Sequence, residues 1–224
     1  MKTAIEIAGL SLTADIGGAL YWAEERLLVI SDLHLEKGSS FAARGRLLPP
    51  YDTGDSLERL TQLCVTYDPK TIITLGDNFH DDGGAERLHS SDRATLGLLQ
   101  SGRDWIWITG NHDPAPARGV GGVSAASVEI GPLTFRHEPE RGALTGEIAG
   151  HLHPVARVSV RGRSLRNRCF VTNGQRIVMP AFGAYTGGLN VQHAAFAGLF
   201  EDFRAHVLGR RQVHAISGRH CLPD

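Results

Sequence analysis

The chain has 224 residues and a formal net charge of −1, and its 42% hydrophobic and 21% charged residues are typical of a globular protein, which excludes a disordered chain. At this length we expect one domain over residues 1–224, with a sizeable core. Residues 1–7 alternate like a strand rather than a secretory leader, and no apolar stretch approaches a membrane span. We therefore expect a cytoplasmic protein with no membrane contact.

The apolar patterning predicts an α/β fold in which strands dominate both ends. We expect strands over 3–8 and 19–31, a loop over 33–51, a helix capped by Asp52 or Thr53 that runs to Thr66, and a second helix over 85–100. We expect the later strands over 126–130, 133–136, 145–149, 155–160 and 168–172, with more beyond 176. Three widely spaced cysteines without a C-x-x-C pair indicate no disulfide framework.

Five short polar stretches contain the candidate metal-ligating and catalytic residues. They are Asp32-Leu33-His34, Gly76-Asp77-Asn78-Phe79-His80, Gly110-Asn111-His112-Asp113, His137 and Gly150-His151-Leu152-His153. The first three follow the apolar runs 27–30, 71–75 and 105–108, and α/β proteins place their sites where buried strands end. Carboxylates, an amide oxygen and imidazoles without a thiolate suit two divalent metals of intermediate hardness.

The spacing within these stretches has a geometric meaning. Side chains alternate along an extended chain, so Asp32 and His34 emerge on one side, as do His151 and His153. The two oxygens of Asp77 could each bind one metal. Two such metals, roughly 3.5–4 Å apart, would clamp a phosphoryl group between them.

This order of motifs resembles that of the calcineurin-like metallophosphoesterases, which carry D-x-H, G-D-x-x-D, G-N-H-[DE], H and G-H-x-H. The resemblance implies an α/β sandwich of two mixed β-sheets flanked by helices. It also implies a first metal held by Asp32, His34, Asp77 and His153, and a second held by Asp77, Asn111, His137 and His151. It further implies that His112 donates to a phosphate oxygen.

The chain departs from that pattern at His80, where most of the superfamily has the second aspartate of G-D-x-x-D. A histidine can protonate a departing alkoxide near neutral pH, so we interpret His80 as a candidate general acid. Two alternatives stay open at this point. His80 could instead orient His112, or Asp81 could have taken over that role.

Charge is unevenly placed along the chain. Residues 1–150 carry 13 Lys or Arg against 21 Asp or Glu, whereas residues 151–224 carry 10 against 3. The basic half could follow a nucleic-acid backbone or could simply be a solvated hairpin, and the sequence favours neither. Candidate substrate contacts are Lys37, Arg157, Arg161 and Arg163. Phe41 and Tyr51 are interpreted as loop anchors in the core, with base stacking as the alternative.

Residues 35–53 and 180–190, together with Phe79-His80-Asp81, are similar to hallmarks of ligase-associated metallophosphoesterases. That resemblance implies a Mn²⁺-dependent endonuclease for single-stranded DNA in DNA repair, associated with an ATP-dependent DNA ligase, a helicase and an exonuclease. The donor set alone would also accept iron or zinc. The alternatives are a small-molecule phosphodiesterase acting on cyclic nucleotides or nucleotide-sugar lipids, and a catalytically idle metal-binding scaffold for repair partners.

Overall fold

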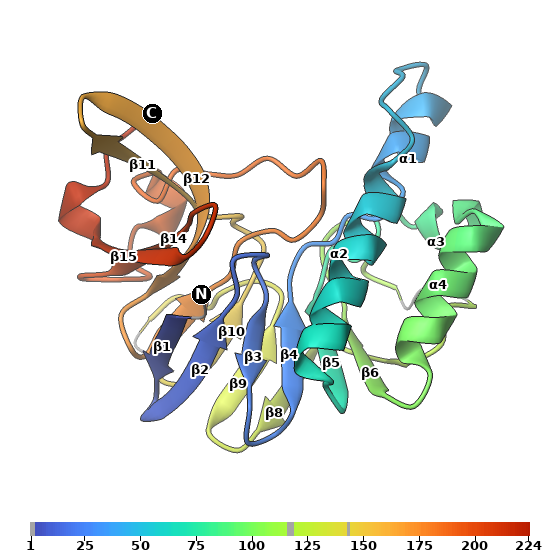
Figure 1. The fold of residues 1–224 in the computed structure, drawn as a ribbon, viewed down its shortest axis with the longest axis horizontal. Helices are drawn as coiled ribbons and strands as arrows, with labels where there is room; N and C mark the ends of the chain where they lie inside the picture. Colours follow the sequence, from blue (N-terminus) through green and yellow to red (C-terminus); the bar gives the residue numbers. More distant parts are fainter. Residues whose placement is uncertain (1–2, 116–118, 143) are drawn as a thin grey trace.

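The structure, a computed structural model, describes residues 3–115, 119–142 and 144–224. Its first sheet has seven strands in sequence order (Figure 1). They are β1 Thr3–Ile7, β2 Leu10–Ala14, β3 Leu20–Trp22, β4 Leu27–Ile30, β5 Thr71–Leu75, β6 Asp104–Ile108 and β7 Val123–Ala125. Strands β1 to β4 pair antiparallel, and β4 to β7 pair parallel.

The second sheet has the order β15-β14-β12-β13-β10-β9-β8, and β11 pairs with β12 outside this path. Its strands are β8 Ser127–Ile130, β9 Leu133–Arg136, β10 Glu147–Ala149, β11 Val155–Val160, β12 Arg163–Thr172, β13 Arg176–Val178, β14 Arg204–Leu208 and β15 Val213–Ser217. Strands β9, β10 and β13 are parallel, and the other pairs are antiparallel. Both sheets are therefore mixed.

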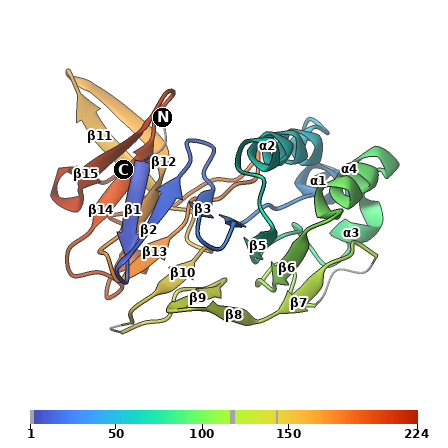
Figure 2. The ribbon, with the colours of Figure 1, turned by 60° about the horizontal axis from the view of Figure 1, so that its bottom comes forward.

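An apolar core joins the two sheets, with Ile5, Val29 and Ile73 from the first facing Phe135 and Phe170 from the second. The helices pack on the outer face of the first sheet, while the β11–β12 hairpin extends from the far end of the second (Figure 2). This arrangement confirms the predicted sandwich of two mixed sheets with helices.

The helices differ from prediction in three places. They are α1 Lys37–Ala43, α2 Asp52–Tyr67, α3 Gly84–Arg87 and α4 Ser90–Gln100, with short 3-10 turns η1 Ala194–Phe196 and η2 Gly218–His220. The predicted loop over 33–51 was wrong because it contains α1. The predicted continuous helix over 85–100 was also wrong, because the chain is extended at Leu88 and the His89 side chain accepts a bond from Ser91 N to start α4.

The predicted cap of α2 was wrong as well. The helix begins at Asp52, and neither candidate side chain caps it, because both bind the segment around α1 instead. Asp52 Oδ2 accepts from Gly38 N at 3.0 Å, and Thr53 Oγ1 donates to Glu36 Oε1 at 2.9 Å. The intrinsic helix propensity of α1 is low, with a glycine and two serines in its seven residues, so these contacts stabilise it.

The strands were predicted in the right regions, with several boundary errors. The expected single strand over 19–31 is the antiparallel pair β3 and β4, joined by a turn in which Arg26 has φ 47°. Strand β2 was missed, and β7 precedes the first strand expected after residue 111. Within the described residues, no helix is both long and apolar enough to cross a membrane.

Candidate metal centre

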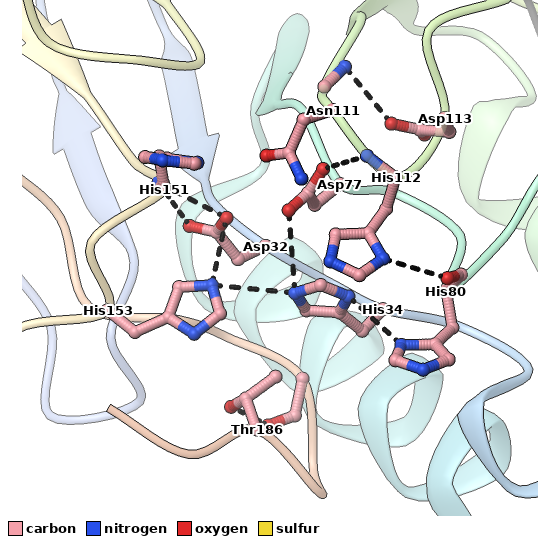
Figure 3. Close-up of polar contacts among 12 residues, drawn as sticks. Asp32, His34, Asp77, His80, Asn111, His112, Asp113, His151, His153 and Thr186 are labelled. Atoms are coloured by element: carbon pink, nitrogen blue, oxygen red, sulfur yellow. Dashed lines mark hydrogen bonds and ion pairs between the residues drawn. The ribbon is translucent and has the colours of Figure 1, made fainter. Parts of the chain in front are cut away.

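Side chains of the loops that follow β4, β5 and β6 converge with those of the loop that follows β10 (Figure 3). His137, in the loop after β9, joins them through its contact with His151. The parallel pairing of β4, β5 and β6 places their carboxyl ends side by side. The same holds for β9 and β10 in the second sheet. All seven predicted ligands therefore come together here. They are Asp32, His34, Asp77, Asn111, His137, His151 and His153.

The first group of possible ligands is Asp32, His34, Asp77 and His153, whose donor atoms lie within 4.8 Å of one another. His153 Nε2 lies 3.1 Å from Asp32 Oδ1 and 3.4 Å from His34 Nε2. His34 Nε2 in turn lies 3.7 Å from Asp77 Oδ2. The two carboxylates are almost fully buried, Asp32 being 0% and Asp77 2% exposed. Buried carboxylates that face each other across imidazoles need a positive charge between them.

The second group shares Asp77 and adds His137 and His151. His137 Nε2 lies 3.4 Å from Asp77 Oδ1, 3.1 Å from His151 Nδ1 and 3.0 Å from Asn111 Oδ1. The Nδ1 of His137 bonds the Leu75 carbonyl at 2.8 Å. That bond places the ring proton on Nδ1, so Nε2 presents its lone pair to the shared point.

Five of these residues have a backbone conformation that L-residues rarely adopt. Their φ angles are positive: Asp32 51°, His34 44°, Asp77 45°, His151 67° and His153 46°. Such strain costs free energy and persists where the surrounding structure fixes it, which is typical of functional sites. The backbone here is held so that side chains from several loops converge.

The protonation states suit cation binding. Burial lowers the pKa of His34 to about 3, and burial together with His137 lowers that of His151. Burial acts to raise the pKa of Asp32, but the bond and charge of His153, the charge of His137 and the bond from Ser31 together outweigh it, and the pKa lies below its usual value. These groups are thus neutral imidazoles and an ionised carboxylate, the forms that bind metal.

His153 is the exception in this set. Burial acts to lower its pKa, but its bond to Asp32 and the charges of Asp32 and Asp77 together outweigh burial and raise it. A proton on His153 would have to leave when a cation binds beside Asp32. Once His153 is deprotonated, these carboxylate, amide and imidazole donors fit two divalent cations that share Asp77.

Glycines let the loops approach this closely. A side chain at Gly110 would collide with the backbone nitrogen and Oδ1 of Asp77, and one at Gly76, where φ is 76°, would collide with the His137 ring. The glycines of the G-D and G-N-H motifs are therefore explained by packing around Asp77.

Asp113 has a larger role than the sequence indicated. Its buried carboxylate accepts from Gly110 N at 3.0 Å, from Asn78 N at 2.9 Å, from Asn78 Nδ2 at 2.8 Å and from Phe79 N at 3.3 Å. It ties the loop after β6 to the loop after β5, and both loops carry ligands. The sequence signal was the acid that closes G-N-H-D and precedes Pro114, a position that is equally compatible with a simple turn.

His80 and His112 stack at the edge of the centre, with ring centroids 5.2 Å apart. His112 Nδ1 lies 3.0 Å from the His80 carbonyl, so the backbone of His80 orients His112. Asp81 pairs with Arg87 at 2.6 Å instead, which disfavours the alternative that it orients His112. His34, His80 and His112 also form a third group that could hold a metal ion.

The other candidates lie around the centre rather than in it. Lys37 Nζ donates to the Tyr185 carbonyl at 2.9 Å, so α1 contacts the segment 180–190 beside the site. The Phe41 ring lies 5.6 Å from that of His80. Tyr51 is 64% exposed, so the expectation that it anchors a loop in the core was wrong. Segment 180–190 also bonds the backbone of Asp32 through Gly183 N at 3.1 Å, so it borders the site.

The arginines of the β11–β12 hairpin lie farther out. Arg161 and Arg163 are exposed at the hairpin tip, where Arg161 has φ 50°. Arg157 and Arg166 lie opposite each other between the tip and the metal centre. The structure thus separates the tip arginines from the pair nearer the site.

The family model of the calcineurin-like phosphoesterases matches residues 25–174. The chain belongs to this family. Among solved structures, the crystal structure of the nuclease MPE from Pseudomonas putida is similar, with a TM-score of 0.74 and 28% sequence identity over 96% of this chain and 100% of that chain. No curated protein sequence matches the chain.

This phosphoesterase is a metal-dependent hydrolase, because the family match coincides with clustered His and Asp side chains that could hold metal. The matched region contains the loops after β4, β5, β6, β9 and β10. The predicted resemblance to a metallophosphoesterase is confirmed by the family match, and the similarity to the nuclease MPE is consistent with the predicted resemblance to an endonuclease.

Proposed function

We propose that this phosphoesterase is a binuclear, Mn²⁺-dependent endonuclease that cuts single-stranded DNA during DNA repair. The observation that carries the proposal is the pair of donor groups that share Asp77. A nuclease of the same fold, similar over nearly the whole chain, supports DNA as the substrate. The excess of arginine over acidic residues in residues 151–224 also supports a nucleic-acid substrate.

In this proposal one cation is held by Asp32, His34, Asp77 and His153, and the other by Asp77, Asn111, His137 and His151. When bound, two such cations supply a hydroxide nucleophile at neutral pH and offset negative charge on the phosphoryl oxygens. The His137 bond to the Leu75 carbonyl and the buried position of Asp77 keep their donor atoms aimed at the shared centre. Mn²⁺ accepts this mixture of oxygen and imidazole ligands.

His112 would hold a phosphate oxygen of the substrate. Its Nδ1 is engaged with the His80 carbonyl, which leaves Nε2 for the substrate. The ring is tied to Asp77 through its own backbone, since His112 N donates to Asp77 Oδ1 at 2.9 Å. A shift of the Asp77 carboxylate would therefore also move His112 and its contact with the substrate phosphate.

His80 would protonate the departing oxygen. Its Nδ1 lies 3.4 Å from His34 Nδ1, so Nε2 is the atom available to a substrate. Burial, Lys37 and His112 lower the pKa of His80 to about 4 in the free protein. A bound phosphodiester brings negative charge, which favours the protonated ring. Lys37 and Arg157 are the proposed phosphate contacts outside the metal centre.

A screen of metals against substrates tests the proposal. Mn²⁺, Zn²⁺, Mg²⁺ and Fe²⁺ are each combined with circular single-stranded DNA, duplex DNA, a cyclic nucleotide, a chromogenic diester and a monoester. We expect steady nicking of single-stranded circles with Mn²⁺ that is lost in His151→Ala. Cleavage confined to cyclic nucleotides would show a small-molecule diesterase, and binding of two metals without hydrolysis of any ester would show an idle scaffold.

The association with a DNA ligase, a helicase and an exonuclease stays a prediction of the resemblance, and the cytoplasmic location stays a prediction of the sequence. Co-purification of the holoenzyme with these partners would test the first. Capture of none of them, with nicking intact, would limit the proposal to the nuclease alone.

A further inference from the structure

Two arginines face each other across the β11–β12 hairpin. Arg157 of β11 lies directly opposite Arg166 of β12 in the antiparallel register. Like charges in that position repel each other. The pair is therefore expected to attract an anion that lies beside both guanidinium groups.

A carboxylate of the chain itself fills this place. Asp224 Oδ1 accepts from Arg166 Nε at 3.0 Å and from Asn190 Nδ2 at 3.1 Å, and its Oδ2 accepts from Arg166 Nη2 at 3.3 Å. Arg157 Nη1 holds the neighbouring Pro223 carbonyl at 3.0 Å. The bonds from Arg166 and Asn190 keep the pKa of Asp224 below its usual value, so the group is an anion.

The carboxylate is held by geometry that also suits a phosphate. The planar guanidinium binds two oxygens of either group in the same fork arrangement. The ion pair is solvent-exposed, with side-chain exposures of 44% for Arg166 and 53% for Asp224. Exposed pairs of this kind are weak, so a competing anion can replace Asp224.

The arginine pair also lies on a direct path from the metal centre. Strand β11 starts two residues after His153, and residue 157 lies four positions along, about 13 Å at the usual rise of an extended chain. Arg166 Nη2 donates to the Gly188 carbonyl at 2.9 Å, and the next residue, Leu189, bonds the His153 carbonyl through its backbone nitrogen at 3.2 Å. One short segment thus contacts both Arg166 and a ligand loop.

We propose that Arg157, Arg166 and Asn190 form a subsite for a backbone phosphate of the DNA strand next to the scissile bond, and that the Asp224 carboxylate occupies this subsite in the free enzyme. DNA binding displaces Asp224, so the carboxylate competes with substrate. The inference rests on the proposed nuclease function. A strand already held at the metal centre presents its next phosphates at high effective concentration, which favours the exchange.

The first test is Asp224→Asn in the Mn²⁺-loaded enzyme, with a single-stranded oligonucleotide as substrate. If the carboxylate fills the subsite for half to five-sixths of the time, KM falls by about two- to sixfold with kcat unchanged. The plot of log kcat/KM against log salt also steepens, because salt weakens the exposed Asp224–Arg166 pair that competes in the wild type, so the two enzymes differ most at low salt and converge at high salt.

A matched control separates local competition from general charge. Asp202 and Arg219 form another exposed pair at 3.3 Å, on the loop before β14 and in η2. Asp202→Asn removes the same charge, and we expect neither KM nor the salt slope to change. An equal fall in KM for both variants would mean that general repulsion of DNA, and no subsite, explains the effect.

The second test is Arg166→Gln alone and combined with Asp224→Asn. The single variant should raise KM for the oligonucleotide about three- to tenfold, the loss of one phosphate contact, and in its background Asp224→Asn should have no further effect. Unchanged KM and salt slope in Asp224→Asn would overturn the subsite even if Arg166→Gln does not fold.

The wild-type enzyme separates this inference from the function on which it rests. If wild type hydrolyses a chromogenic diester but not the oligonucleotide, the proposed nuclease function fails, and the subsite with it. If wild type cleaves the oligonucleotide and Asp224→Asn is indistinguishable from it, only the subsite fails.

Discussion

The metal centre and the β11–β12 hairpin both gather charged or ligating side chains, but they are built in opposite ways. Asp32 and Asp77 are buried, and their loops are fixed by glycines and positive φ angles. Arg157 and Arg166 lie on an antiparallel ribbon whose partners come from residues 188–190 and 222–224.

The two regions therefore differ in how firmly they hold their charged side chains in place. Buried ions need fixed partners because desolvation penalises every misplaced charge. Exposed ions can exchange partners because water and salt screen each contact. The centre is therefore suited to chemistry, and the hairpin to reversible contact with a substrate.

The largest effect should come from Asp77→Ala, since this carboxylate belongs to both donor groups. We expect phosphodiester hydrolysis to fall by at least about a thousandfold. Metal analysis of the purified variant should find fewer than two ions per chain. Asp104→Ala, at the exposed start of β6, is the matched control and should keep both activity and metal. Full turnover by Asp77→Ala would refute the centre as described.

Asp113→Ala should have the next largest effect, through position rather than chemistry. Removing the carboxylate leaves buried N–H groups of Gly110, Asn78 and Phe79 without their partner, which costs about 2–4 kcal/mol of stability. We expect kcat to fall about ten- to hundredfold, and Asp113→Asn to restore part of both quantities. Denaturation midpoints and metal content provide the measurement. A wild-type midpoint in Asp113→Ala would show that the bonds are dispensable.

These two residues also show what a sequence can and cannot predict. Asp77 was predicted because metal binding requires a particular set of residue types at particular spacings, and these are visible in the sequence. Asp113 was undervalued because a buried carboxylate that accepts four backbone and amide bonds looks, in sequence, like any acid before a proline. Three of its four donors come from Asn78 and Phe79, more than thirty positions earlier.

The same limit explains the errors in the fold. Helix α1 was predicted as a loop because its propensity is low, and it forms through contacts with Asp52 and Thr53 of another helix. The apolar runs that became β4, β5 and β6 were predicted well, since a buried parallel strand needs a continuous apolar segment. Which exposed residues meet, such as Arg166 and Asp224, depends on distant chain segments that leave no local pattern.

His80→Ala tests the edge of the metal centre, with an effect that depends on the leaving group. We expect diesters with poor leaving groups to lose about ten- to a hundredfold in kcat, and activated nitrophenyl esters to lose little because their leaving groups need no proton. His214→Ala, an exposed histidine on β15, serves as the control. Equal losses on both ester classes would assign His80 to orienting His112 and not to proton transfer.

The smallest effect should come from the hairpin tip, in the double variant Arg161→Ala/Arg163→Ala. Arg161 lies six residues beyond the start of β11, about 20 Å along an extended strand, whereas charges in physiological salt are screened over about 8 Å. We therefore expect KM for a single-stranded oligonucleotide to rise by less than about twofold, well below the effect of Arg166→Gln. Measuring both variants at the same ionic strength gives the comparison. If the tip variant has the larger effect, the strand runs along the outer hairpin, and the exposed region binds DNA by net charge without a defined subsite.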